Sequence, residues 1–428
     1  FNMLKSHVER LKFIRNIDII VGIDIAKETH WARIISPCGL EFCKPFPINN
    51  NIIDFKLLED KIKNIMSKNN LKNVIIGMEP TGSYGSALIK FLVNTGFYVV
   101  NVMSNHVKKA KELDDNTPTK NDRKDALTIA NLIKEGRYHD IYIPKGTYAD
   151  LRILTTNRQE WIRNKVHCNN KIICILDQYF PEFQSVFKDI SGKSSMQILS
   201  KYPLPEDILS VDIETLRNNT KIANGKRRIS KTKIVALYTF AQNTIGITND
   251  VSYIKTNINF LINEYKHILN NLEYIETQMS QVLSKLEEAQ YITSVKGISD
   301  IFASDLIGEL GDITRFQNWK QIRKYAGYNF KEESSGKKKG QTVISKRGRP
   351  FLRYTLYQVA LSLVSNNNEF KKLFEYFKTR KKNPLKGSQA LVAVAMKFLR
   401  VMFYLVTNKR KYDSSRVLGE YREQQIAA

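Results

Sequence analysis

Four carboxylates in the first third of the chain are placed where they could act together. Asp24 lies within the apolar run DIIVGIDIA, Glu79 follows the apolar run NVIIGM, and Asp122 and Asp125 lie three residues apart in KNDRKDALTIANLI. A carboxylate among apolar strand residues is costly to bury unless a partner compensates its charge. Converging carboxylates bind hard cations such as Mg2+, and two such ions about 3.5–4 Å apart activate a nucleophile on a phosphodiester and stabilise its leaving oxygen.

The four residues are therefore predicted to be catalytic and to be the ligands of Mg2+. The alternative assigns them ordinary structural roles. Asp24 would then cap a strand end and Glu79 would be a surface charge. Asp122 and Asp125 would be helix N-terminal residues, which the helix dipole favours.

A second set of reactive groups lies in the segment KEESSGKKKG, where Ser334 and Ser335 precede a run of lysines. A serine hydroxyl is a poor nucleophile unless a base or a metal assists it, and charge that develops on a phosphate needs a cation. The spacing does not choose between the two serines, and both could also be loop residues in a patch that grips phosphates. The residues predicted to bind nucleic acid are Lys296, Gly297, Lys337, Lys338, Lys339, Lys346, Arg347, Arg349 and Arg353.

The elements that must position the carboxylates follow an α/β order. β-branched and aromatic residues predict three strands in succession, and helices and strands then alternate. A meander of three strands followed by alternating helix and strand is typical of an RNase H-like fold. The expected strands are residues 18–26, 30–36, 41–48, 73–80 and 97–104, and the expected helices are residues 52–66 and 84–96.

The middle of the chain is predicted to be all helical. Apolar residues from Ile254 to Leu286 recur at alternating steps of four and three, which is the heptad pattern of a coiled coil. This seam could pair with a second chain or fold back on an earlier helix, and we expect self-association. The predicted domains are 1–147 (α/β), 148–290 (helical and coiled coil) and 291–428 (small and mainly α).

Composition favours a polyanionic partner, because 67 Lys and Arg against 42 Asp and Glu give a net charge of +25. Lys397 and Arg400 interrupt the longest apolar stretch, so we expect a cytoplasmic protein with no membrane partner. The segment from Ser294 to Asp312 resembles a helix-hairpin-helix element, whose turn offers backbone N–H groups to a phosphate. An ordinary helix turn is the alternative.

Taken together, these motifs resemble the DEDD transposases of the insertion-sequence 110 family over nearly the whole chain. The N-terminal marks are GIDIAK, GMEPTG and KNDRKDA, and the C-terminal marks are KGIS, YAG, SSG, ISKRG and LR. The sequence departs from the family at AGYNF, where a proline commonly follows.

The resemblance implies an N-terminal RuvC-like domain whose carboxylates hold Mg2+, and a C-terminal transposase domain in which Ser335 attacks DNA. It also implies a noncoding guide (bridge) RNA from the element, donor and target DNA as partners, and dimers that assemble into a tetramer at a prokaryotic nucleoid. The function that it implies is an RNA-guided DNA transposase, or recombinase. Two alternatives are a RuvC-like, structure-specific endonuclease that uses water, and a catalytically silent nucleic-acid-binding protein.

Overall fold

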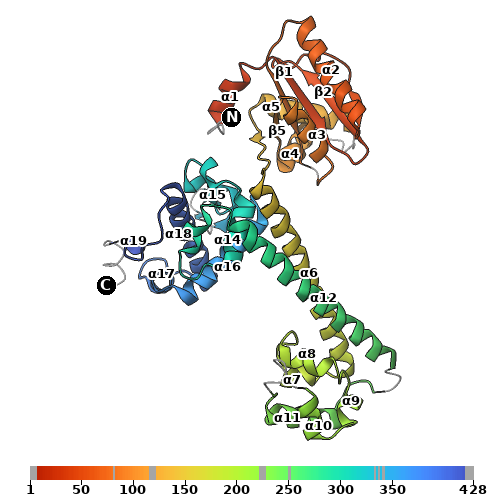
Figure 1. Ribbon diagram of the computed structural model, residues 1–428. Helices are drawn as coiled ribbons and strands as arrows, with labels where there is room; N and C mark the ends of the chain where they lie inside the picture. The colour runs from red at the N-terminus through yellow and green to blue at the C-terminus, as the bar shows by residue number, and fades with distance from the viewer. Residues whose placement is uncertain are drawn as a thin grey trace. The chain divides into compact units, whose positions relative to one another are not determined.

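The computed structural model describes residues 7–80, 82–114, 122–220, 228–248, 252–331, 334–335, 338–339 and 343–419. The chain divides into two compact units, 1–143 and 144–428 (Figure 1). The first unit is a sheet with helices on its faces, and the second is almost entirely helical.

The first unit contains six strands and five helices within its described residues. Its strands are β1 (Ile19–Asp24), β2 (Thr29–Ile35), β3 (Phe46–Asn49), β4 (Val74–Met78), β5 (Tyr98–Asn101) and β6 (His139–Asp140). Its helices are α1 (His7–Ile14), α2 (Ile52–Lys68), α3 (Ser86–Asn94), α4 (Ser104–Asp114) and α5 (Asp122–Lys134).

The six strands form one mixed sheet in the order β3-β2-β1-β4-β5-β6. The meander β1-β2-β3 is antiparallel, whereas β1, β4 and β5 are parallel to one another. Parallel neighbours need crossover connections, and the helices supply them. The predicted order of a three-strand meander followed by alternating helix and strand is therefore confirmed.

Alternation along the central strands gives the sheet two apolar faces. Odd-numbered β1 residues such as Val21 and Ile23 pack with α2 and α3, in one core. Even-numbered Ile20 packs with Ile75 of β4 and with α5, in a second core. Because successive side chains of a strand point to opposite faces, Gly22 and Asp24 belong to the α5 face together with Ile20.

Two details of the first unit differ from the prediction. The expected third strand, 41–48, is shorter, because only its end forms β3 and Glu41 makes an isolated bridge to Ile35. Pro45 and Pro47 have no backbone N–H group to donate to a neighbouring strand. Pro47 is tolerated because β3 is an edge strand of the sheet. Helices α1 and α4 and the short β6 were not predicted.

The second unit carries a helical pair, a group of short helices and a C-terminal helical bundle. The first elements are α6 (Thr147–Tyr179), α7 (Phe183–Val186), α8 (Lys193–Leu199), α9 (Pro205–Leu209), α10 (Ile213–Asn219), α11 (Lys231–Gln242) and α12 (Ser252–Leu283). The later helices are α13 (Ala289–Thr293), α14 (Asp300–Leu310), η1 (Ile313–Arg315), α15 (Trp319–Tyr325), α16 (Pro350–Asn366), α17 (Asn368–Thr379), α18 (Gly387–Thr407) and α19 (Ser415–Leu418). The later strands are β7 (Phe330–Lys331), β8 (Ser334–Ser335), β9 (Lys338–Lys339) and β10 (Val343–Ile344).

The heptad seam of α12 packs against α6 of the same chain, and the two helices run side by side (Figure 1). The pair is antiparallel, because Arg158 bonds Glu276, Trp161 contacts His267, and the Cys168 thiol donates to the Leu261 carbonyl. Seam residues from Ile258 to Met279 are buried within this chain. The structure thus takes the alternative in which the seam folds back on an earlier helix, and the expectation that this seam joins two chains is corrected. The physical reason is that α6 already supplies the apolar complement.

The second unit has two apolar cores, one near each end of the α6–α12 pair. Short helices α7 to α11 build one of them with the C-terminal part of α6 and the N-terminal part of α12. The other joins Met279 and Leu283 of α12 to α14, α16 and α18. Helix α18 is long and apolar enough to cross a membrane, but nine of its residues are buried, and eight of them, among them Phe398 and Met402, lie in this second core. Packing inside the protein therefore accounts for its apolar character.

Candidate active site

The first two predicted carboxylates stand at one edge of the central sheet. Strands β1 and β4 are parallel neighbours, and Ile23 pairs with Met78 at the end of their ladder. Asp24 is the last residue of β1, and Glu79 directly follows the last residue of β4. Both side chains are partly buried. The same register and the same alternation put both residues on the α5 face, at the carboxyl ends of the strands. Ligand sites of open α/β sheets form at such ends.

Asp125 reaches this edge from α5. That helix lies directly over β1, because a Cβ added at Gly22 would clash with the backbone of Ala126 and Ala130. Asp125 precedes Ala126 and is nearly buried, and its carboxylate lies 2.5 Å from the Lys111 ammonium of α4. Lys111 was not predicted from the sequence, although it lies in the basic stretch KKAK.

Asp122 is the first residue of α5, one turn before Asp125, and its side chain lies outside the described part of the chain. Among the described side chains, no group of three or more carboxylate, imidazole or thiol groups could hold a metal ion. The described candidates are Asp24 and Glu79 at the sheet edge and Asp125 on α5, where it pairs with Lys111, and these three do not by themselves form a metal-binding group. Oxygen donors of this kind match the ligands that Mg2+ prefers.

His30 supports the turn that follows Asp24. Its Nδ1 accepts a hydrogen bond from the Ala26 N–H at 3.2 Å, and the ring is fully buried. Burial lowers the pKa of His30, which keeps the imidazole neutral so that Nδ1 can accept. The exit of the chain from β1 is thereby fixed immediately after the carboxylate.

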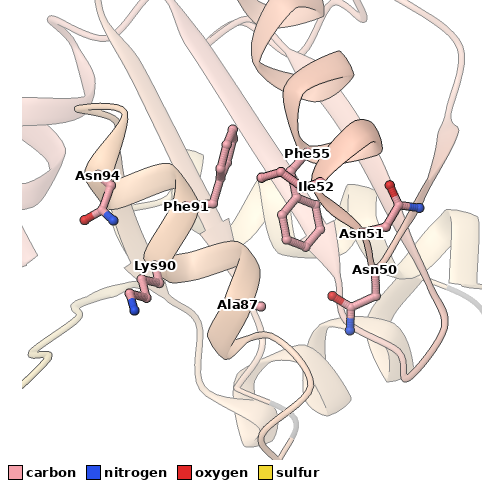
Figure 2. Close-up of a pocket in the computed structure, with 8 residues that line it drawn as sticks. All are labelled: Asn50, Asn51, Ile52, Phe55, Ala87, Lys90, Phe91 and Asn94. Atoms are coloured by element: carbon pink, nitrogen blue, oxygen red, sulfur yellow. The ribbon is translucent and has the colours of Figure 1, made fainter.

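Figure 2 shows a pocket of the first unit with the residues that line it. It has a volume of about 400 Å³ and lies between α2 and α3, with Phe55 and Phe91 among its walls. Helices α2 and α3 cover the sheet face opposite to α5. The pocket is therefore not the acidic site.

Ser334 and Ser335 form the short strand β8 of the second unit. One two-stranded sheet pairs β7 with β10, and another pairs β8 with β9, and we call these two small sheets together the serine hairpin. The register of β8 and β9 puts Ser335 opposite Lys338 and Ser334 opposite Lys339. The backbone thus brings each predicted nucleophile beside a predicted phosphate-binding lysine, whereas Lys337 lies outside the described residues.

The root of this hairpin is a close contact between the segments YAG and SKRG. A Cβ at Gly348 would lie 2.5 Å from both the Gly327 nitrogen and the Tyr325 carbonyl oxygen, so only glycine fits. Gly327 has φ +78°, a conformation that favours glycine. The Lys346 N–H donates to the Gly327 carbonyl. Two of the motifs quoted from the sequence therefore build one joint.

Two predicted phosphate-binding arginines are engaged in this joint. Arg353 donates to the Ala326 carbonyl at 3.0 Å and to the Lys346 carbonyl at 3.3 Å. Arg349 makes two hydrogen bonds to the Glu309 carboxylate, at 2.8 and 2.9 Å. Lys346 and Arg347 are exposed. The structure therefore separates the predicted basic cluster into two arginines that brace the joint and two residues that face solvent.

Comparisons with known proteins match both candidate sites to one family. The DEDD transposase model of the IS110 family matches residues 21–181, and the model of the transposase IS116/IS110/IS902 family matches residues 289–375. Together they cover more than half of the chain. The "Insertion element IS116 uncharacterized 44.8 kDa protein" of Streptomyces clavuligerus is 21% identical over 93% of this chain and 97% of its own length. The chain belongs to the IS110/IS116 family of transposases.

A second relative covers a smaller part of this transposase. The "Transposase for insertion sequence element IS1111A" of Coxiella burnetii (strain RSA 493 / Nine Mile phase I) is 29% identical over 29% of this chain and 35% of its own length. The first family model includes all four carboxylates and the whole of α6, and the second includes Ser335 and the joint. Each candidate site thus lies inside a segment typical of the family.

The predicted helix-hairpin-helix turn of the transposase is packed against α16. Gly297 has φ +101°, its carbonyl accepts from the Ser362 hydroxyl at 2.6 Å, and the Lys296 carbonyl accepts from Asn367 at 3.3 Å. Asp300 occupies the first turn of α14, where its charge disfavours an approaching phosphate. The Lys296 side chain is exposed, so it is the part of this turn that faces solvent.

One exposed surface of the transposase was missed from the sequence. Tyr253, Phe260 and Tyr274 of α12 are between 67% and 86% exposed and lie at spacings of seven or fourteen residues. Close to this stripe, α6 and α12 line a groove of about 480 Å³ that includes His167 and Lys171. The signal was present, because these residues each precede a seam position. The sequence analysis considered only the apolar seam positions of this helix and not the aromatic residues next to them.

Proposed function

We propose that this transposase is an RNA-guided DNA recombinase that cuts and rejoins donor and target DNA. The observation that supports it best is that each unit carries a distinct set of candidate reactive residues. Carboxylates lie at the edge of a mixed sheet, and a serine lies on a hairpin with lysines opposite. A simple nuclease needs only the first site.

The fold proposed for the first unit is RNase H-like, of the RuvC type. Its support is the strand order, in which an antiparallel meander is followed by parallel β4 and β5. In this arrangement the carboxyl ends of the parallel strands β1 and β4 lie side by side, and α5 packs on the sheet face that carries Asp24. Asp24 and Glu79 then stand at one edge of the sheet, and Asp125 lies on the helix that crosses β1.

The residues proposed to hold Mg2+ are Asp24, Glu79, Asp122 and Asp125. Bound Mg2+ would activate the attacking oxygen and neutralise charge on the scissile phosphate. The protein's own contribution is to hold the carboxylates on rigid strands and to balance Asp125 with Lys111. Lys111 also keeps the buried Asp125 carboxylate paired.

Ser335 is proposed as the nucleophile. Its Oγ attacks the phosphorus atom, an Oγ–P bond forms, and one bond between phosphorus and a deoxyribose oxygen breaks. The serine proton passes to a base and the released oxygen takes up a proton. Rejoining reverses these steps with a different strand as the attacking group, so no external energy source is needed. The lysines opposite the serines would stabilise phosphate charge.

The proposed partners are donor DNA, target DNA and a guide RNA encoded by the element, bound by a dimer or tetramer of the chain at the prokaryotic nucleoid. A net charge of +25 supports a large polyanionic partner. The exposed rings of Tyr253, Phe260 and Tyr274 support contacts with single-stranded RNA, whose bases stack on aromatic side chains.

The test is a search for a covalent adduct on a denaturing gel. Full-length protein is incubated with labelled donor DNA, Mg2+ and the element's RNA, and the wild type is compared with Ser335→Ala and Ser334→Ala. We expect an adduct that is lost only in Ser335→Ala. Cleavage without any adduct in all three proteins would establish hydrolysis by water instead, and binding without metal-dependent cleavage would leave a silent nucleic-acid-binding protein. RNA guidance is tested by changing the RNA's pairing segment, which should redirect the cut site.

A further inference from the structure

Glu309 is a buried carboxylate whose only described side-chain bonds lead to the root of the serine hairpin. It lies on α14, and its side chain is 3% exposed. Both of its oxygens accept from Arg349, at 2.8 and 2.9 Å. A bidentate pair of this kind fixes direction as well as distance. This hydrogen bonding raises the pKa of Arg349 further, so the pair stays ionised.

Arg349 stands at the point where the hairpin meets the helical bundle. Its N–H donates to the Tyr325 carbonyl at 2.9 Å, and it directly precedes Pro350, the first residue of α16. Gly348, the residue before it, fits closely against Gly327 and Tyr325. A movement of the Arg349 side chain would therefore move the segment that holds β10 and its partner strand β7, which ends three residues before Ser334 in the chain.

Glu309 is itself held to α6. Arg152 of α6 donates to the Gly308 carbonyl at 2.8 Å and to the Glu309 carbonyl at 2.5 Å. A Cβ at Gly308 would lie 2.7 Å from the Thr155 hydroxyl, so the two helices touch here. The contacts form one chain from α6 through α14 and Arg349 to the hairpin.

We propose that Glu309 is a positioning residue for the serine nucleophile, acting through Arg349 to fix the root of the hairpin against α6. This inference rests on the proposed function of Ser335. The physical reason is that a hairpin of two-residue strands has too few ladder bonds to set its own direction. A buried ion pair is directional, because a shift of either partner leaves a charge without compensation.

The same helix offers a matched control. Asp305 lies one turn before Glu309, its side chain is 6% exposed, and it also pairs with an arginine, Arg158, at 3.1 Å. That arginine belongs to α6 and also bonds Glu276. The Asp305 pair therefore joins helices to each other and does not reach the hairpin. A purely structural role for buried ion pairs on α14 predicts the same effect at both positions.

The test measures three quantities for wild type, Glu309→Gln, Glu309→Asp, Arg349→Lys and Asp305→Asn: the rate of adduct formation at saturating donor DNA, the Kd for that DNA, and the melting temperature. Full-length protein with Mg2+ and RNA is used throughout. We expect Glu309→Gln to slow adduct formation roughly 10²-fold, because displacement of a reacting group by about 1 Å costs that much. Its Kd should stay within about twofold, and Glu309→Asp should recover part of the rate.

Arg349→Lys keeps the charge but loses the two parallel hydrogen bonds, so it should slow the reaction as well. A double variant that combines Glu309→Gln with Arg349→Lys should react no more slowly than Glu309→Gln alone. Asp305→Asn should keep the wild-type rate. A Glu309→Gln rate within about twofold of wild type overturns the proposal, and so does an equal loss in Asp305→Asn. If Glu309→Gln fails to fold, Arg349→Lys and Glu309→Asp decide by the same criteria.

Ser335→Ala in the same series separates this inference from the function on which it rests. A wild-type adduct that survives in Ser335→Ala removes Ser335 as the nucleophile, and the positioning role falls with it. An adduct that requires Ser335 but forms at the wild-type rate in Glu309→Gln removes only the positioning role.

Discussion

The two candidate sites are held in place by different means. Asp24 and Glu79 follow directly from a parallel ladder, and Asp125 lies on a helix that a glycine allows to touch that ladder. Within its described residues, the serine hairpin has two ladders, β7–β10 and β8–β9, with two residue pairs each. Its root depends instead on glycine contacts and on arginines that donate to carbonyl and carboxylate oxygens.

This difference teaches where each site is sensitive. Loss of one carboxylate from a rigid sheet edge is expected to remove the proposed chemistry and to leave the fold intact. A change at the serine hairpin need not touch the serine, because the direction of the hairpin is set by residues far from it in the sequence. The comparison gives four predictions, in order of decreasing effect.

Asp24→Asn should lower DNA strand cleavage by at least about 10²-fold, because a lost metal ligand removes several kcal/mol of charge stabilisation. DNA binding and the melting temperature should change little, since Asp24 ends a strand whose core is apolar. Cleavage rate, Kd and thermal melting are measured together. Exposed Glu28→Gln is the control. A parallel loss of binding and folding would mean that Asp24 is structural and that the sheet edge is no more robust than the hairpin.

Ile268→Ala should destabilise the second unit by about 2–5 kcal/mol, because Ile268 is buried in the α6–α12 seam of one chain. Leu269→Ala, at a side chain that is 39% exposed, should stay within about 0.5 kcal/mol. Urea unfolding measures both. Dissociation of an oligomer in light scattering, with unchanged unfolding of the chain, would instead place this seam between chains.

Gly348→Ala should cost about 1–3 kcal/mol through overpacking at the hairpin root and should slow adduct formation. The acidic site should keep its metal affinity. Gly387→Ala is the matched control, since a Cβ there meets nothing within 4 Å. Adduct rates and calorimetric Mg2+ titration of both variants give the answer. Equal behaviour of the two variants would show that the glycine contact does not fix the hairpin.

Asp305→Asn should remove a pH dependence of stability. Burial raises the pKa of Asp305 to about 7, against the opposing effect of Arg158. Between pH 4 and 7 the unfolded chain has lost this proton while the folded chain keeps it, so folding stability falls as pH rises through this window. We expect a loss of about 3 kcal/mol at most between pH 5 and pH 8, since about two pKa units separate pH 5 from the pKa of the folded state and one unit is worth about 1.4 kcal/mol. Melting temperatures at pH 5 and pH 8 should lie closer together in the variant than in wild type.

Several parts of the fold could be predicted because their signals are local. The β-branched runs around Asp24 and Glu79 are continuous in the sequence, and strand alternation fixes which residues share a face. The heptad stripe of α12 was equally clear. Its partner was not, because an apolar stripe is satisfied by any apolar complement, and nothing local distinguishes α6 from a second chain.

The basic segment shows the same limit within the candidate site. In the sequence, Lys346, Arg347, Arg349 and Arg353 form one cluster with a single interpretation. In the structure, Arg349 meets Glu309 forty residues away, and Arg353 meets backbone carbonyls. Lys111 was missed for a similar reason, because its partner Asp125 lies on the next helix.

The sequence by itself determined the chemistry that this transposase can carry: the carboxylates, the adjacent serines, the excess positive charge and the elements that hold them. Residue type and periodicity are local properties, and a single chain displays them completely. The tertiary structure alone decided which charges are paired, which helix covers the α12 seam, and what holds the serine hairpin. Those outcomes depend on contacts between residues distant in the chain, where burial makes an unpaired charge or an uncovered apolar stripe too costly to leave.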